Sequence, residues 1–121
     1  MTKHHLLGSR GETLACQYLE TLGYEILDQN WTFQKAEIDI IAYKNQIIVF
    51  VEVKTRSGDA FGKPEEAVHF AKQKVMERAA EEYIYLMEHQ GEIRFDIISI
   101  LFESPDKYAL SHIEDAFWPE A

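Results

Sequence analysis

The sequence predicts one α/β domain, with a central mixed β-sheet flanked by helices. Two segments with helical periodicity, at residues 8–22 and 64–88, alternate with four segments of strand composition. The predicted order is therefore helix, three strands, helix, strand. The 121 residues suit a single domain over residues 1–121, with a core over about 8–101 and an acidic C-terminal extension over 102–121.

Both helices are predicted from apolar spacing and from signals at their ends. Over residues 8–22 the apolar side chains recur at helical intervals, and Gly23 follows as a C-terminal stop. Glu12 lies on the same stripe, so its carboxylate should point toward the core. Over residues 64–88, Pro64 and the acids after it favour a helix start, and apolar residues then recur every three or four positions.

The strands are predicted from their β-branched and aromatic content. The four segments are YEILDQNWTF at 24–33, AEIDIIAYK at 36–44, QIIVFVEVKTR at 46–56 and IRFDIISILF at 93–102. A further segment, YALSHIEDAF at 108–117, is either a short edge strand or a loop. Only Asn45 and Gln46 lie between the second and third strands, which favours a tight hairpin.

This hairpin predicts which side chains meet. With a two-residue turn, Asp39 faces Glu52 and Glu37 faces Lys54. The face that carries Asp39 and Glu52 is otherwise apolar, and so is the opposite face, which reads Ile38, Ile40 and Ala42 against Val53, Val51 and Val49. Two acids are therefore expected at one end of a buried hairpin.

Such a pair needs compensation. Two carboxylates about 5 Å apart repel by about 3 kcal/mol at an effective dielectric near 20. A shared proton, a nearby lysine or a divalent cation could offset this. Lys54 lies on the same face as Glu52, and carboxylates holding Mg²⁺ (or Mn²⁺) beside a lysine suit phosphodiester hydrolysis. A plain ion pair between Glu37 and Lys54 is the structural alternative, and Glu12, as a third inward acid, favours the site.

Several sequence blocks together resemble a known family. The blocks that carry the resemblance are GSRGE, LGYEILDQNW, EIDIIA, VFVEVKTR, FGKPEEAV, Lys72 and RFDII, in this order. They are similar to the YraN family of small predicted endonucleases, which resembles archaeal Holliday junction resolvases within the PD-(D/E)xK, restriction-endonuclease-like group. The resemblance covers Gly8 to Ile100. One departure is Ala36, where the family usually has glycine.

The resemblance implies a restriction-endonuclease-like fold of order αβββαβ and a set of site residues. The metal ligands would be Glu12, Asp39 and Glu52, and Lys54 would complete the catalytic group. Contacts with DNA phosphates would come from Arg10, Arg56 and Lys72. Asp96, in the last strand, is interpreted as a structural residue rather than a further site residue.

The charge distribution bears on partners. A net charge of −9 argues against a general nucleic-acid coat, but residues 54–78 hold six basic and four acidic residues, which favours local contact with DNA. Resolving a junction takes two symmetric cuts, which would call for a homodimer. The sequence has no apolar run near the roughly 18 residues of a membrane span and a single cysteine, Cys16, so we expect a cytoplasmic protein.

Two functional hypotheses follow. The first is a metal-dependent DNA endonuclease that hydrolyses phosphodiester bonds in branched or otherwise structured DNA. The second is a non-catalytic module with a nuclease fold, which binds DNA or, through its acidic C-terminal region, a protein partner.

Overall fold

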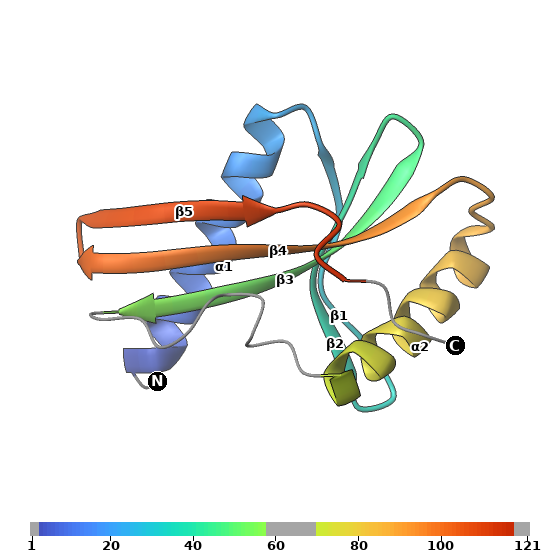
Figure 1. The fold of residues 1–121 in the computed structure, drawn as a ribbon, viewed down its shortest axis with the longest axis horizontal. Helices are drawn as coiled ribbons and strands as arrows, with labels where there is room; N and C mark the ends of the chain where they lie inside the picture. The colour runs from blue at the N-terminus through green and yellow to red at the C-terminus, as the bar shows by residue number, and fades with distance from the viewer. Residues whose placement is uncertain (1–2, 58–69, 118–121) are drawn as a thin grey trace.

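The computed structural model describes residues 3–57 and 70–117, which form a five-stranded sheet with one helix on each side. In chain order the elements are α1 (Lys3–Thr21), β1 (Glu25–Phe33), β2 (Ala36–Lys44), β3 (Ile47–Ser57), α2 (Phe70–Met87), β4 (Ile93–Ser104) and β5 (Lys107–Ile113) (Figure 1). The strands lie in chain order across the sheet, and only β3 and β4 are parallel. The predicted α/β class with a mixed sheet is confirmed.

The first helix ends as predicted and begins earlier than predicted. It starts at Lys3 rather than near Gly8. At its end, Gly23 has a φ of 93°, a conformation that glycine adopts without steric cost. The N–H of Gly23 donates to Glu20 O and the N–H of Tyr24 donates to Leu19 O, each at 3.0 Å, so two carbonyls of the last turn are satisfied.

The tight turn between β2 and β3 is confirmed. Asn45 and Gln46 have φ values of 52° and 67°, the signature of a type I′ turn, whose twist matches that of the two strands. The strands pair in the predicted register from Lys44 opposite Ile47 to Ile40 opposite Val51. The predicted start of the second helix at Pro64 lies outside the described residues.

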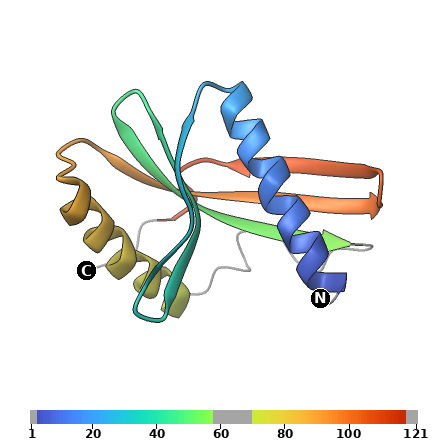
Figure 2. The ribbon, with the colours of Figure 1, turned by 180° about the vertical axis from the view of Figure 1, so that it is seen from behind.

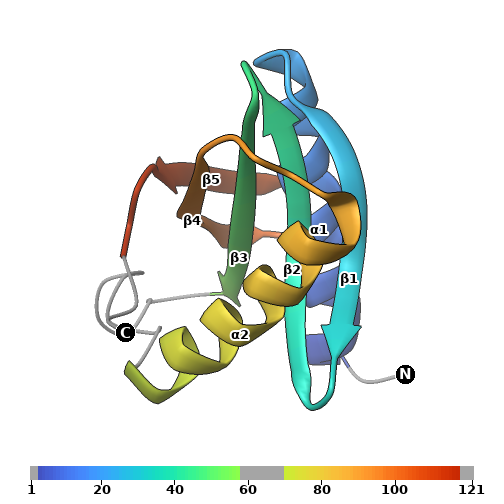
Figure 3. The same ribbon diagram turned by 90° about the vertical axis from the view of Figure 1, so that its right-hand side faces the viewer.

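The two helices cover opposite faces of the sheet (Figures 2 and 3). On the α1 side lies a core that we call the α1-side core, with Ala15, Leu19, Ile40, Val49, Val51 and Ile98 among its buried members. On the other side lies the α2-side core, with Ile38, Ile41, Phe50, Met76, Tyr83 and Phe95. Each fully buried side chain of this size stabilises the fold by roughly 1.5–3 kcal/mol. Among the described residues, neither helix is long and apolar enough to cross a membrane.

Residues 102–104 and 107–113, which follow the predicted core, belong to the sheet. Of the two alternatives for this segment, the edge strand is the one observed, because β5 pairs antiparallel with β4. Beyond β5, the N–H of Ala116 donates to Phe95 O at 2.8 Å, and the ring of Phe117 stacks on that of Phe95 with centroids 5.3 Å apart. Ala116 and Phe117, which follow β5, therefore pack on the α2-side core.

Gly11 allows α1 to lie directly against β3. A Cβ at this position would stand 2.0 Å from Oγ1 and 3.1 Å from both Cβ and Cγ2 of Thr55, so rotating the threonine cannot remove the clash. A Cβ on Gly8, in the same helix, would meet nothing within 4 Å. Close packing against β3 therefore favours glycine at position 11 but not at position 8.

We expect Gly11→Ala to lower the free energy of unfolding by about 1–3 kcal/mol, because α1 must move away from β3. Gly8→Ala is the matched control and should leave stability unchanged or raise it by about 0.5–1 kcal/mol through helix propensity. Urea denaturation of both variants measures the difference. Equal stability of the two would contradict the close approach.

Candidate functional site

The site begins where β2 and β3 part. Their pairing stops at Ile40 and Val51, after which β3 continues alongside β4 and β2 continues alongside β1. Asp39 and Glu52 are thus the first residues beyond the last pair. Asp39 Oδ2 accepts a hydrogen bond of 2.8 Å from the N–H of Val53, an amide that β2 no longer pairs. We call this place the fork.

The parting of the strands overturns both predicted pairs at the site. Asp39 was expected opposite Glu52 and Glu37 opposite Lys54, but the β2–β3 register ends at Ile40 opposite Val51, before either pair. The reason is that a hairpin register holds only as far as the two strands stay hydrogen-bonded.

A twist in the β1–β2 hairpin overturns a second expectation. Ile38 lies in the α2-side core and Ile40 in the α1-side core, although they were expected on one face. Asn30, across the hairpin from Asp39, has a φ of 52°, which asparagine tolerates better than most residues. This left-handed residue accompanies the change of face, and the change turns Glu37 and Asp39 toward α1.

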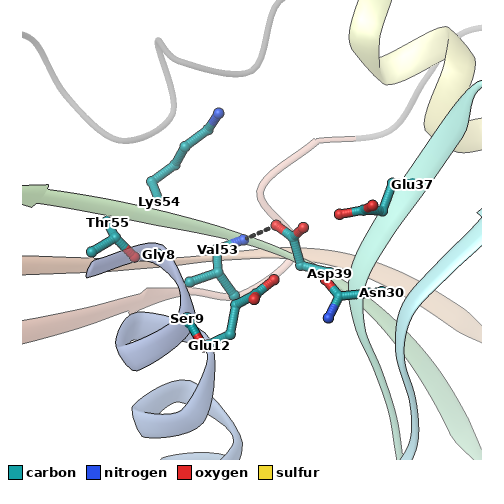
Figure 4. A pocket seen from close by; sticks show the side chains of 9 residues that line it. All are labelled: Gly8, Ser9, Glu12, Asn30, Glu37, Asp39, Val53, Lys54 and Thr55. Atoms are coloured by element: carbon teal, nitrogen blue, oxygen red, sulfur yellow. Dashed lines mark hydrogen bonds between the residues drawn. The ribbon is translucent and has the colours of Figure 1, made fainter. Parts of the chain in front are cut away.

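The result is a cluster of three carboxylates, Glu12, Glu37 and Asp39, which we call the acidic cluster. One oxygen of each lies within 4.8 Å of the others. They come from α1 and β2, and they point toward one another in Figure 4. They line a fork pocket of about 590 Å³, formed by Gly8, Ser9, Glu12, Asn30, Glu37, Asp39, Val53, Lys54 and Thr55. Glu12 points inward, as its helical position predicts.

The electrostatics of this cluster are unfavourable for three free anions. Burial, and then the charge of Glu52, raise the pKa of Asp39 to about 7, although the Val53 N–H lowers it in part. Asp39 therefore keeps its proton to a higher pH than an ordinary carboxyl does. A cation at the acidic cluster would favour the ionised form.

Glu52 forms a second centre, on the α2 side of β3. It is 4% exposed. Its Oε1 accepts a short hydrogen bond from Lys72 Nζ of α2 and lies 3.4 Å from Lys54 Nζ. Its Oε2 is buried and has no hydrogen-bond partner among the described residues. Burial lowers the pKa of Lys72, but the hydrogen bond and the charge of Glu52 outweigh this and raise it.

The two centres share a wall. Asp39 and Glu37 line both the fork pocket and a neighbouring one of about 410 Å³, which we call the helix pocket. The helix pocket is formed by Lys35, Ala36, Glu37, Asp39, Glu52, Ala71, Lys72, Val75 and Met76. The structure thus brings together Glu12, Asp39, Glu52, Lys54 and Lys72 of the predicted set.

Two predicted residues lie apart from these pockets. The guanidinium of Arg10 stands over the ring of Phe102, 4.7 Å from its centroid. Arg56 lies farther along β3, in register with Leu101. Among the described residues, neither arginine lines the fork pocket or the helix pocket.

Asn30 was not among the predicted site residues, and Glu37 was predicted to face Lys54 rather than to join the acidic cluster. The spacing of Glu37 and Asp39, two residues apart on one strand, does place them on one face. This spacing does not predict whether their shared face points toward α1 or α2, because that depends on the twist at Asn30.

Asp96 belongs to a separate, satisfied network. It is fully buried, and it accepts hydrogen bonds from Arg94 Nε (2.8 Å) and the Asp115 N–H (3.0 Å), with His112 Nε2 at 2.7 Å. Burial alone would raise the pKa of Asp96, but these bonds hold it below its ordinary range. His112 Nδ1 lies 3.0 Å from Tyr18 Oη, so the network ties α1, β4 and β5 together.

The fold and the site define a class of protein: an α/β protein with a mixed five-stranded sheet, whose fork holds three converging carboxylates. Residues 11–100 match the Uncharacterised protein family UPF0102, and the chain belongs to this family. A UPF0102 protein of Flavobacterium psychrophilum is 48% identical over 118 residues, covering 98% of each chain. Another from Bacteroides thetaiotaomicron is 44% identical over 119 residues, again covering 98% of each.

Among solved structures, the chain is similar to SfsA of Pyrococcus furiosus in complex with Ca²⁺. The identity is 15% and the TM-score is 0.39, over 92% of this chain and 63% of SfsA.

Asp39 and Asp96 should respond oppositely to replacement. Because the folded pKa of Asp39 is raised, its ionisation destabilises the metal-free fold progressively as pH rises from about 4 to 7. Asp39→Asn should therefore gain stability relative to wild type between pH 4.5 and pH 8 in EDTA, as measured by urea denaturation.

Asp96 has a lowered pKa, so its contribution is present above the ordinary carboxyl range and is lost as pH falls. We expect Asp96→Asn to lower stability at pH 8 by about 3–5 kcal/mol, because Arg94 then loses its buried partner. The same denaturation series measures it. A stable Asp96→Asn, or an Asp39→Asn whose advantage shrinks as pH rises, would contradict these assignments.

Proposed function

We propose that this protein is a metal-dependent DNA endonuclease that hydrolyses phosphodiester bonds, with branched or otherwise structured DNA as its substrate. The observation that carries the proposal is the convergence of Glu12, Glu37 and Asp39 beside a lysine-paired glutamate, Glu52. The resemblance to the restriction-endonuclease-like group, with its αβββαβ order, gives the proposal its reaction class. A resolvase-like reaction would need a homodimer.

The donor set fits a hard divalent cation, Mg²⁺ or Mn²⁺. Two oxygens on opposite sides of a bound Mg²⁺ lie about 4 Å apart, and on a larger Ca²⁺ about 5 Å apart. The oxygens of the acidic cluster lie within 4.8 Å of one another. In addition, Glu52 Oε2 is buried without a partner among the described residues. The ligands would be Glu12, Asp39 and Glu52, with Glu37 as a further oxygen donor.

The chain's own residues have distinct roles in this proposal. A bound cation supplies a Lewis acid that activates water and neutralises charge on the phosphate. Lys54, at the edge of the fork pocket, orients the attacking water. Lys72 positions Glu52 through their hydrogen bond, and it offsets the negative charge that would otherwise repel a phosphate. Arg10 and Arg56 remain proposed contacts with more distant phosphates.

The second candidate is a non-catalytic module that binds DNA or a protein partner. The net charge of −9 favours it, because the protein repels DNA outside a narrow approach. So does the pairing of Glu52 with two lysines, which compensates its charge without a metal. Only the nuclease proposal requires a cation at the acidic cluster.

For the nuclease, Asp39→Asn and Glu52→Gln should each lower the cleavage rate by about 100-fold or more, since a bound cation contributes several kcal/mol to the transition state. The assay follows cleavage of single-stranded, duplex, flapped and four-way-junction DNA with Mg²⁺ or Mn²⁺. Glu103→Gln, an exposed carboxylate on β4, is the control and should cleave as wild type does. Undiminished cleavage in both site variants would refute the proposed chemistry.

Metal binding is measured separately by thermal unfolding. Mn²⁺ at about 100 times its dissociation constant should stabilise the wild type by about 2.7 kcal/mol and raise its melting temperature. The same rise is expected in Glu103→Gln, whereas Asp39→Asn should lose it. No response of the wild type at millimolar Mn²⁺ would favour the binding module.

A further inference from the structure

A third pocket continues the site toward the tip of the β1–β2 hairpin. This hairpin pocket has a volume of about 340 Å³ and is formed by Phe33, Gln34, Lys35, Ala36, Val75 and Arg78. It shares Lys35, Ala36 and Val75 with the helix pocket, which in turn reaches Glu52 and the acidic cluster. The helix pocket and the hairpin pocket therefore adjoin between the hairpin and α2, and the fork pocket, on the α1 side, meets the helix pocket at Glu37 and Asp39. We call this row of three adjoining pockets the groove.

The two cations of the hairpin pocket have no partner among the residues that the structure describes. Lys35 and Arg78 are exposed, and within residues 3–57 and 70–117 neither makes a salt bridge or a side-chain hydrogen bond. The neighbouring lysines differ. Lys54 and Lys72 are paired with Glu52, and Lys74 lies 3.9 Å from Glu77. In a protein of net charge −9, two unpaired cations in one pocket are available for an external anion.

The charge along the groove changes sign. Three carboxylates and one lysine line the fork pocket, whereas the described residues of the hairpin pocket include Lys35 and Arg78 and no acid. The helix pocket lies between them and carries Lys72 on its α2 wall. Lys72, Val75 and Arg78 follow at three-residue intervals along α2, so the same helix supplies a wall to both pockets.

Both cations lie on elements that pack against each other. Lys35 lies in the tight connection of the β1–β2 hairpin, next to Gln34 with its φ of 56°. Phe33, at the end of β1, stacks on Trp31 with nearly parallel rings, centroids 6.4 Å apart. Trp31 in turn packs edge-on against Tyr83 of α2. The hairpin tip and α2 therefore keep a defined spacing around the pocket.

We propose that the hairpin pocket binds the phosphodiester backbone of the DNA strand that is cut, beyond the scissile phosphate at the acidic cluster. The inference rests on the proposed nuclease function and extends it. Arg78 offers a planar fork that can donate two hydrogen bonds to one phosphate, and Lys35 adds a point charge. The apolar side chains of Phe33 and Val75 provide a surface for the sugars between phosphates. The substrate must then continue past the cut on the side of this pocket.

The test measures DNA binding and cleavage separately. Binding of a fluorescein-labelled four-way junction is followed by anisotropy over a series of salt concentrations, in the Asp39→Asn background so that the DNA stays intact. Lys35→Gln/Arg78→Gln should weaken binding about tenfold or more. It should also reduce the slope of log K against log salt by about 1.4–1.8, the loss of two phosphate contacts. Single Lys35→Gln should show about half of the slope change.

Lys107→Gln is the matched control for Lys35→Gln. Both are exposed lysines at or beside a hairpin turn, and both changes remove one positive charge, but Lys107 is the first residue of β5, after the turn from β4, and pairs with Glu103. The DNA affinity and salt slope of the Lys107→Gln variant should equal those of the Asp39→Asn parent. Melting temperatures confirm that each variant is folded.

The outcomes separate this inference from the proposed function. If the wild type cleaves DNA through Asp39 while the Lys35 and Arg78 variants keep the parent's affinity and salt slope, the hairpin-pocket proposal is overturned and the nuclease proposal stands. If the wild type neither binds nor cleaves any of the DNA forms, both are overturned. Reduced affinity and slope in the double variant, with Lys107→Gln unchanged, support the inference.

Discussion

The hydrogen bond from the Val53 N–H to Asp39 is the contact on which the site depends. It lies at the point where β2 leaves β3, and it satisfies an amide that would otherwise stay unpaired inside the protein. A hydrogen bond to a side chain thereby replaces one backbone hydrogen bond between β2 and β3. Because Asp39 accepts this hydrogen bond, the two strands can separate without leaving the Val53 amide unpaired. The opening between them is the fork pocket.

The carboxylates at the fork are arranged differently from the buried carboxylate elsewhere in the fold. Asp96 is fully buried and has a complete set of donors, which makes it a structural anion. Glu52 is nearly as buried but leaves Oε2 without a partner among the described residues, and Asp39 keeps a raised pKa. Leaving a buried carboxylate oxygen without a partner is costly, and perturbed carboxylates of this kind are typical of functional sites.

The lysines around the fork limit that cost. Lys72 and Lys54 converge on Glu52, so a single glutamate joins α2 to the end of β3. The same helix then extends the groove to Arg78, whose charge has no partner among the described residues. Lys54, Lys72, Lys35 and Arg78 thus lie along the three adjoining pockets of an otherwise acidic protein, and local contact with a polyanion requires such a run of positive charge.

By itself, the sequence determined four of the strands, the turn at Asn45 and Gln46, and the placement of Asp39 and Glu52 at the same end of that hairpin, because local periodicity and turn chemistry specify a hairpin register. Only the tertiary structure decided that Glu37 and Asp39 turn toward Glu12, since this depends on the left-handed Asn30 and on the close packing of α1 that Gly11 allows. No local pattern encodes where a strand pair stops or which helix its last side chains meet. These are properties of packing between elements.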